Sequence, residues 1–275
     1  MEDTKQDARL RRLIACADEE LDAGALEALW RDTARRVQES LDVIGRPPAT
    51  VGITDSPLGR LLVARSERGI VLIEFLKDDG AIAPALAKLR RAFDPVEDAT
   101  AAAEVSAEIT RYLEGDGAAL RQSVDLTLAD EGFAKRVLNA LMAVPRGALI
   151  SYIALGAAAG AAHSARAVGG AMHRNPVPVY VPCHRVIAAD GGLGGYGGGP
   201  SRKLKLLRAE GFALDEAAKP RLSGAAVWAH RRTGVYCRMD CRAALRADRA
   251  RMLFFADAAR AEQAGMRPCK RCRPA

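Results

Sequence analysis

One cysteine of this chain, Cys183, stands directly between a proline and His184. The stretch PCHR at 182–185 is followed by the glycine-rich loop GGLGGYGGGP at 191–200 and by a basic segment. Because the thiolate is the reactive form of cysteine and a neighbouring base favours it, this pattern indicates a nucleophile. Glycines, having no side chain, let a flat or phosphorylated group approach closely. A buried structural cysteine is the alternative, since the side chains of adjacent residues usually diverge.

Four further cysteines form two close pairs. Cys237 and Cys241 are separated by three residues, Cys269 and Cys272 by two, and 27 residues lie between the pairs. Four thiols at this spacing suit one tetrahedral zinc ion, and in a reducing compartment they point to a metal rather than to disulfides. The sequence therefore predicts one zinc site. Cys16, in an acidic segment, has no such partner and is expected only to pack.

The basic residues are concentrated in the second half of the chain. The net charge is +7 over 275 residues, but residues 1–125 sum to −7, residues 126–221 to +6 and residues 222–275 to +8. Contacts to phosphates supply most of the non-specific affinity of proteins for nucleic acids, so this half has the charge that DNA binding needs. A generic basic surface would carry the same charge, and charge alone does not decide between the two.

The composition excludes several classes of protein. Hydrophobic residues make up 49% of the chain and charged residues 27%, as in an ordinary folded protein and unlike a disordered one. The N-terminal segment carries acids and no apolar core, which argues against a secretory signal. The most apolar run, 147–162, is too short to span a bilayer and is expected to be a packed helix. We therefore expect a cytoplasmic protein without a membrane partner.

Several elements must position these side chains. Apolar residues at three- and four-residue steps predict a helix over 7–44, which the prolines of GRPPAT at 45–50 end. Residues 51–76 alternate short β-branched runs with turn residues, which predicts antiparallel strands. Helices are predicted around 82–93 and 101–113, and a further one from Phe133 to Met142.

Two short helices joined by a tight connection are expected between residues 151 and 175. A helix-turn-helix that offers its second helix to DNA is one interpretation, and a simple helical hairpin is the other. The stretch 214–224 reads as a linker. His163, His173 and His230 read as ordinary surface or turn residues.

The stretch RAVGGAMHRNPVPVYVPCHRVI at 166–187, with the loop GYGGGP and the segment KLKLLRAEG, closely resembles the active-site region of the O6-alkylguanine-DNA alkyltransferases. The resemblance covers about residues 49–213. It implies that Cys183 accepts the alkyl group of an O6-alkylguanine flipped out of double-stranded DNA. It also implies that His184 acts as base through a water, and that Glu210 holds and polarises His184.

The same resemblance implies further site residues. Arg166 would fill the gap left by the flipped nucleotide, Tyr152 would assist its rotation, and Asn175 would brace the turn before the active site. The implied DNA-binding positions are Tyr152, Ala165, Arg166 and Gly169, and the implied substrate pocket consists of Met172, Pro178, Val186, Tyr196, Gly197 and Gly198. Because nothing here regenerates a thioether, the implied activity is that of a single-turnover methylated-DNA–[protein]-cysteine S-methyltransferase.

The segments RRTGVYCRMDC at 231–241 and LFFADAARAEQAGMRPCKRCRP at 253–274 resemble the zinc domain of the Ada family of adaptive-response proteins. This resemblance implies that Cys237 accepts a methyl group from a methylphosphotriester in DNA. Zinc would keep the bound sulfur a thiolate and help to fold the module. A module that only clamps DNA is the alternative. The chain departs from the Ada pattern because the zinc segment follows the alkyltransferase segment, its start is abbreviated, and no second helix-turn-helix adjoins it.

Together these patterns predict a multi-domain α/β protein, expected to be a monomer. Its expected parts are a helical extension (1–47), a sheet-plus-helix domain (48–125), a winged helix-turn-helix-like active-site domain (126–213), a linker (214–221) and a zinc domain (222–275). The favoured function is direct, irreversible repair of alkylated DNA. A damage sensor with a zinc-domain switch and a cysteine hydrolase using Cys183 and His184 are the rivals. The hydrolase lacks an evident oxyanion arrangement and leaves the basic half unexplained.

Overall fold

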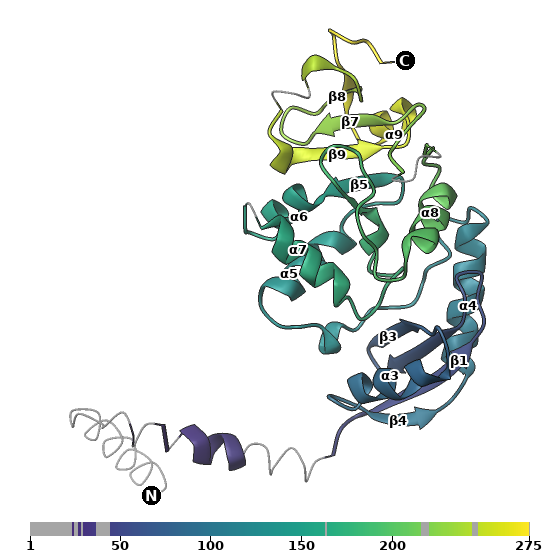
Figure 1. Cartoon of the computed structure of the whole chain (residues 1–275), viewed down its shortest axis with the longest axis vertical. Helices are drawn as coiled ribbons and strands as arrows, with labels where there is room; N and C mark the ends of the chain where they lie inside the picture. The colour runs from purple at the N-terminus through teal and green to yellow at the C-terminus, as the bar shows by residue number, and fades with distance from the viewer. Residues whose placement is uncertain are drawn as a thin grey trace, which may run out of the picture. The chain divides into compact units, whose positions relative to one another are not determined.

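The computed structural model describes residues 45–162, 164–215, 220–243 and 247–274, and most of residues 24–36 (Figure 1). The chain divides into a unit at 1–46 and a compact unit at 47–275. The described residues from Gly24 to Arg36 are helical, as predicted. The rest of the predicted N-terminal helix, Cys16 and His163 lie outside the described residues.

A four-stranded sheet with the order β3-β2-β1-β4 opens the compact unit. Strands β1 (Pro48–Thr54), β2 (Leu61–Ser66) and β3 (Gly69–Phe75) are antiparallel, as predicted. The edge strand β4 (Asp94–Glu97), which pairs parallel with β1, was not predicted because it is short, mostly exposed and contains a proline.

Helices cover both faces of this sheet because side chains alternate along its strands. Leu61 and Val63 belong to the large hydrophobic core with residues of α4 (Thr100–Leu113). Leu62 and Ala64 instead belong to a smaller core with residues of α3 (Ile82–Leu89). The sheet is therefore buried on both sides, and α4 connects it to the second half of the unit.

Four helices form the middle of the unit: α5 (Phe133–Met142), α6 (Tyr152–Ala158), α7 (Ala165–His173) and α8 (Pro200–Ala209). The two short helices predicted between residues 151 and 175 are α6 and α7. The prediction of one packed helix over 147–162 was wrong in its first part, because Ala148–Ser151 forms strand β5. This strand is entirely buried, between β6 (Val186–Ile187) and β9 (Met252–Phe255).

The second sheet has six strands in the order β10-β8-β7-β9-β5-β6. Four of them, β7 (Val227–His230), β8 (Val235–Arg238), β9 and β10 (Arg267–Pro268), come from residues 222–275, here called the cysteine module, which also contains helix α9 (Ala258–Gln263). Strand β9 pairs antiparallel with β5 through Ala148↔Phe255, Leu149↔Phe254 and Ile150↔Leu253. The sheet therefore runs from the cysteine module into the preceding segment.

The predicted linker is attached to the glycine-rich loop where the structure describes it. Arg221 forms a bridge with Gly192, and the Leu193 amide donates to the carbonyl of Pro220 at 3.3 Å. The abbreviated start of the cysteine module supplies β7, which pairs with both β8 and β9. The module is thus supported by the sheet that it shares with β5.

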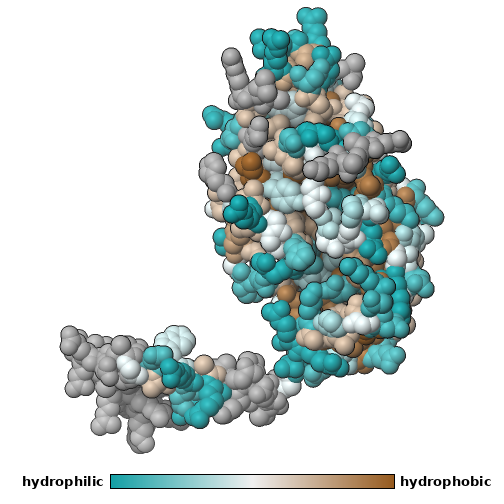
Figure 2. Space-filling model, viewed as in Figure 1, coloured by the Kyte–Doolittle hydropathy of each residue, from teal (hydrophilic) through white to brown (hydrophobic). Residues whose placement is uncertain are grey.

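The surface of the described residues is mixed in character. On the face shown in Figure 2, apolar residues lie in small patches among hydrophilic ones. No helix among the described residues is long and apolar enough to cross a membrane.

Candidate active site and metal centre

His184 and Glu210 form a completely buried pair beside Cys183. The Nε2 atom of His184 lies 2.6 Å from Oε1 of Glu210, and both residues are 0% exposed. Cys183–Arg185 form a 3-10 turn that leads into β6, and Glu210 caps the C-terminal end of α8. The fold thus brings the predicted base and carboxylate into contact, and the predicted nucleophile precedes the base in the chain.

Three further groups hold the Glu210 carboxylate. Tyr112 donates its hydroxyl at 2.5 Å, Arg185 donates Nε at 3.0 Å, and the Gly147 amide donates at 3.1 Å. Burial by itself would raise the pKa of Glu210, but His184, Arg185 and Tyr112 outweigh it and lower that pKa to about 2. Sequence reasoning gave no role to Tyr112, Arg185 or Gly147.

The imidazole of His184 is held neutral. Burial lowers its pKa, against the opposing effect of the Glu210 carboxylate. A neutral ring that donates Nε2–H to Glu210 keeps Nδ1 as an acceptor. Nδ1 is buried and has no hydrogen-bond partner among the described residues, so it is the atom available to accept a proton.

Asn175 fixes the loop that carries Cys183. Its Nδ2 donates to the Val181 carbonyl at 3.0 Å and to the Cys183 sulfur at 3.2 Å, and its Oδ1 accepts from the Val177 amide at 3.1 Å. Within this loop Val179 has φ 77°, a conformation that β-branched residues rarely adopt. Burial raises the pKa of the Cys183 thiol, while the Asn175 hydrogen bond and the Lys203 charge oppose that rise.

Lys203 is a buried site residue that sequence reasoning missed. It is 1% exposed, and its Nζ donates to the carbonyls of Val186 at 2.7 Å and Gly195 at 3.3 Å, and to that of Leu193. It thereby ties β6 to the glycine-rich loop. Burial lowers its pKa to about 8. The available signal was its position on the apolar face of α8, in register with Leu206 and Leu207.

A pocket of about 400 Å³ opens onto Cys183. Its lining consists of Tyr152, Gly169, Met172, His173, Cys183, Gly195, Tyr196 and Gly197. It includes six residues predicted for the site; His173, predicted to be an ordinary surface residue, is exposed and also lines it. Pro178, Val186 and Gly198 lie outside this lining, and their place in the substrate pocket stays a prediction.

Two tyrosines and the second half of α7 border the pocket. The Tyr152 hydroxyl donates to the Gly195 carbonyl at 3.4 Å, and burial raises the pKa of this tyrosine. The Tyr196 hydroxyl lies near Cys183 and has no hydrogen-bond partner of regular geometry among the described residues. Ala165 and Arg166 begin α7, and Arg166 is exposed.

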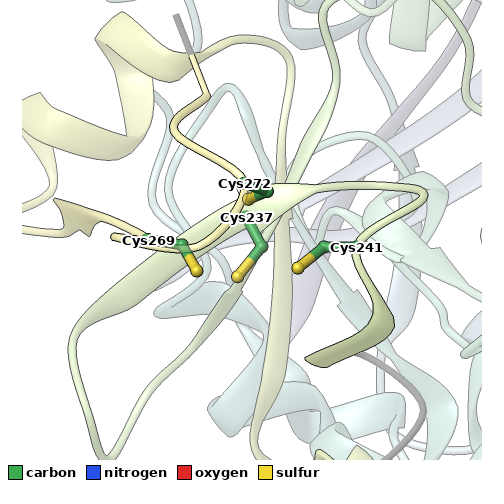
Figure 3. A group of neighbouring side chains, drawn as sticks. All are labelled: Cys237, Cys241, Cys269 and Cys272. Carbon is green, nitrogen blue, oxygen red and sulfur yellow. The ribbon is translucent and has the colours of Figure 1, made fainter.

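The four cysteines of the module converge (Figure 3). Cys237 lies on β8, and the sulfurs of Cys237, Cys241, Cys269 and Cys272 are all within 4.8 Å of one another. A tetrahedral site with Zn–S bonds of about 2.3 Å has sulfurs about 3.8 Å apart, so a small contraction would close this set on the ion. Four thiols are also the donors that zinc prefers. The residues fit one zinc ion.

The four ligands differ in their surroundings. Cys237 and Cys241 are buried, whereas Cys269 and Cys272 are half-buried. Burial, together with the neighbouring thiols, raises the pKa of Cys237. Hydrogen bonds from the backbone amides of Cys272 and Arg271 lower the pKa of Cys269 to about 7.

A second cavity, of about 600 Å³, lies between α6 and the cysteine module. It is lined by Ala157, Ala158 and Ala162 on one side and by Arg231, Arg232, Asp248, Ala250 and Arg251 on the other. Asp248 partly neutralises Arg251, at 3.1 Å. The remaining positive charge gives the module a basic edge beside the first of the two short helices.

Three family models match consecutive segments of this chain. Residues 50–126 match the family "6-O-methylguanine DNA methyltransferase, ribonuclease-like domain", residues 132–212 match "6-O-methylguanine DNA methyltransferase, DNA binding domain", and residues 215–275 match "Metal binding domain of Ada".

Curated relatives cover the same segments. The chain is 35% identical over 191 residues to the methylated-DNA–protein-cysteine methyltransferase of Rattus norvegicus, covering 64% of this chain and 88% of that protein. It is 35% identical over 163 residues to the bifunctional transcriptional activator/DNA repair enzyme Ada of Escherichia coli, covering 58% of this chain and 44% of that protein. The crystal structure of Mycobacterium tuberculosis OGT in complex with DNA aligns with 58% of this chain and 92% of that chain, at 32% identity and a TM-score of 0.49. The chain belongs to the family of methylated-DNA–protein-cysteine methyltransferases and combines it with an Ada-type metal-binding domain.

Proposed function

We propose that this protein repairs DNA by transferring the alkyl group of O6-alkylguanine irreversibly to Cys183. One observation carries the proposal: Cys183 lines a pocket, and the next residue in the chain, His184, forms a completely buried pair with Glu210. A structural cysteine would not need a neutral, buried imidazole with a free acceptor atom next to it.

The transfer proceeds as an in-line displacement. His184 takes the thiol proton at Nδ1 through a water, while Glu210 stabilises the imidazolium that forms. The Cys183 sulfur attacks the alkyl carbon, the carbon–O6 bond breaks, and its electron pair leaves with the guanine, which takes up a proton. The backbone amides of the glycine-rich loop are donors available to the base, and the hydroxyl of Tyr152 becomes one when it leaves the Gly195 carbonyl. The product is a thioether, which nothing in the site reverses.

Double-stranded DNA is the partner that brings the base to this pocket. A guanine cannot react inside the duplex, so it is flipped out, and its damaged pairing lowers the cost. Helices α6 and α7 form the winged helix-turn-helix-like reader, and exposed Arg166 at the start of α7 fills the gap. Tyr152, Ala165 and Gly169 contact the DNA beside it. The arginines of the second cavity extend the phosphate-binding surface onto the cysteine module.

We further propose that Cys237 accepts a methyl group from methylphosphotriesters. When bound, zinc keeps the four sulfurs as thiolates at neutral pH. Cys237 is 2% exposed and Cys269 and Cys272 are half-buried, so peptide mapping after reaction with methylphosphotriester DNA identifies the acceptor. A module that only clamps DNA would carry no methyl on any of the four.

The proposal also includes the division of the chain into five parts: 1–47, 48–125, 126–213, 214–221 and 222–275. It further includes a monomeric state and a location in the reducing cytoplasm. Free thiols in a set of four suit that compartment. The four-stranded sheet lies in the second part, and the six-stranded sheet is shared by the third and fifth parts.

The proposal is tested by stoichiometry. The full chain is incubated with an excess of duplex carrying one O6-methylguanine whose methyl is radiolabelled. We expect one label per protein molecule and no turnover, no transfer by Cys183→Ala, and normal transfer by the control Cys16→Ala. Label on Cys183→Ala, or multiple turnover by the wild type, would refute the proposal.

A further inference from the structure

One side chain of the cysteine module, Arg260, contacts the backbone around Glu210. Strand β9 pairs with β5, and the chain then turns into α9, which begins after Asp257. The Asp257 carboxylate accepts from the Arg260 amide at 2.8 Å and so caps this helix. The guanidinium of Arg260 is thereby directed toward the start of β5 and the end of α8.

The contacts of this guanidinium converge on the residue that holds His184. Nη1 of Arg260 donates to the backbone carbonyl of Glu210. The guanidinium also lies over two glycines: a Cβ atom on Gly211 would be 2.7 Å from Nη2, and one on Gly147 would be 3.0 Å from Nη1. Both glycines have positive φ, at 87° and 78°, a backbone conformation that favours glycine.

Gly147 is itself a ligand of the carboxylate, since its amide donates to Oε2 of Glu210 at 3.1 Å. Arg260 therefore touches both backbone segments that fix the Glu210 side chain: the end of α8, which carries it, and the turn before β5, which donates to it. A cation at this place also complements the free carbonyls at the C-terminal end of α8.

We propose that Arg260 is a positioning residue for guanine alkyl transfer, through which the cysteine module holds the Glu210–His184 pair in the geometry that activates Cys183. This inference rests on the proposed function. It assigns the module a part in the chemistry at Cys183 that is separate from any methyl transfer to its own cysteines. Because positioning errors far smaller than a side chain slow such reactions strongly, loss of Arg260 should affect rate and not only stability.

A purely adhesive role for Arg260 gives a different expectation. Removing one hydrogen bond between the module and the rest of the chain would lower the melting temperature and leave the reactivity of the folded protein unchanged. The test therefore needs measurements that do not depend on the stability of the folded protein. Arg267 in β10 provides a matched control, because it is exposed and its side chain makes no hydrogen bond or ion pair within the described part of the chain.

The experiment compares Arg260→Ala, Arg260→Lys and Arg267→Ala in the full zinc-loaded chain, below the melting temperature of each. Two quantities are measured: the rate of benzyl transfer from free O6-benzylguanine, which needs no DNA, and the pH profile of Cys183 alkylation by iodoacetamide, mapped by mass spectrometry. We expect Arg260→Ala to slow benzyl transfer about ten-fold and to move the midpoint of the alkylation profile to higher pH. Arg260→Lys should keep most of the wild-type transfer rate and a midpoint close to that of the wild type, and Arg267→Ala should match the wild type in both quantities.

An Arg260→Ala protein with a lower melting temperature but an unchanged rate and pH profile would overturn the inference. If the wild type transfers neither this benzyl group nor the methyl group of an O6-methylguanine duplex, the proposed function fails instead. The iodoacetamide profile still decides the role of Arg260 in that case, because it does not depend on alkyltransferase activity.

Discussion

Asn175 donates a hydrogen bond to the sulfur of Cys183 across 3.2 Å. The same nitrogen donates to the Val181 carbonyl at 3.0 Å. One amide group therefore fixes the loop before the nucleophile and also contacts the nucleophile itself. A donor at this distance stabilises the thiolate more than the thiol, which offsets part of the cost of its burial.

Asn175→Ala should accordingly raise the pKa of Cys183. Hydrogen bonds to charged groups contribute about 1.5–3 kcal/mol, so the pKa should rise by at least about one unit, and transfer from O6-benzylguanine at neutral pH should slow about ten-fold. The measurement is the pH–rate profile of that transfer. Asn139→Ala, an exposed position on α5, is the control. A profile identical to that of the wild type would show that Asn175 only braces the loop.

Arg166→Ala should separate base flipping from chemistry. Repair of an O6-methylguanine duplex should slow much more than reaction with free O6-benzylguanine, because only the duplex requires a nucleotide to be rotated out. Both rates are measured on one protein preparation. Arg90→Ala, at an exposed arginine after α3, is the control and should change neither rate. Equal losses on the two substrates would mean that Arg166 supports the fold.

The neutral state of His184 should appear in the pH dependence of stability. Its pKa is lowered in the folded protein, so the unfolded chain binds a proton first, and stability is lost as pH falls below about 6.5. The free energy of unfolding of the wild type minus that of His184→Gln should decrease by about 1.4 kcal/mol per pH unit below that point. Urea titrations from pH 7.5 to 5.0 measure it, and zinc loss cancels in the difference. A difference that stays constant would mean that folding does not shift the pKa of His184, and a difference that increases as pH falls would mean that buried His184 is protonated.

Local patterns in the sequence predicted the individual helices and strands better than the way these elements pack together. The antiparallel strands, α5 and the two short helices followed from periodicity and turn residues over a few positions. The packing around Glu210 could not be predicted in this way, because Tyr112 lies 98 residues from it and Arg260 lies 50 residues from it. The β5–β9 pairing could not be predicted for the same reason. The short run 148–151 has a helix-like sequence, and only the two strands that pair with it show that it is a strand.

Buried charges were the other gap. Lys203 lies in a basic segment of the chain, yet it is enclosed by backbone carbonyls. The quoted motif contained Arg185 without indicating that its guanidinium turns inward to Glu210 and to the Val144 carbonyl, at 2.5 Å from the latter. For such residues the charge is known from the sequence, but the partner that neutralises it can be identified only in the folded structure.

Methylation of Cys237 should tighten DNA binding. A divalent ion with four thiolates carries a net charge of about −2, and a thioether in place of one thiolate removes one negative charge close to the phosphates. One charge at that distance is worth on the order of 1 kcal/mol and is screened by salt. The full zinc-loaded chain should therefore bind undamaged duplex several-fold more tightly after reaction with methylphosphotriester DNA, with a gap that narrows as salt rises.

The control for this switch is Cys183→Ala, which removes the guanine reaction and keeps the module intact. Affinities are measured by fluorescence anisotropy at low and high salt, and the methylated residue is identified by peptide mapping. A methyl group on Cys237 without a change in DNA affinity would support methyl transfer to Cys237 and refute the predicted effect of methylation on DNA binding. If no cysteine of the module carries a methyl group, the module only binds DNA. A methyl group on Cys269 would show that this half-buried cysteine is the acceptor.

The central claim is that Cys183 is the alkyl acceptor for O6-alkylguanine, and peptide mapping by mass spectrometry tests it most directly. The wild-type chain is incubated with one equivalent of duplex containing a single O6-methylguanine, digested and sequenced by fragmentation. The account predicts one added methyl group, on the sulfur of Cys183, with restored guanine in the DNA. A methyl group on any other residue, or unmodified Cys183 with the lesion intact, would contradict it.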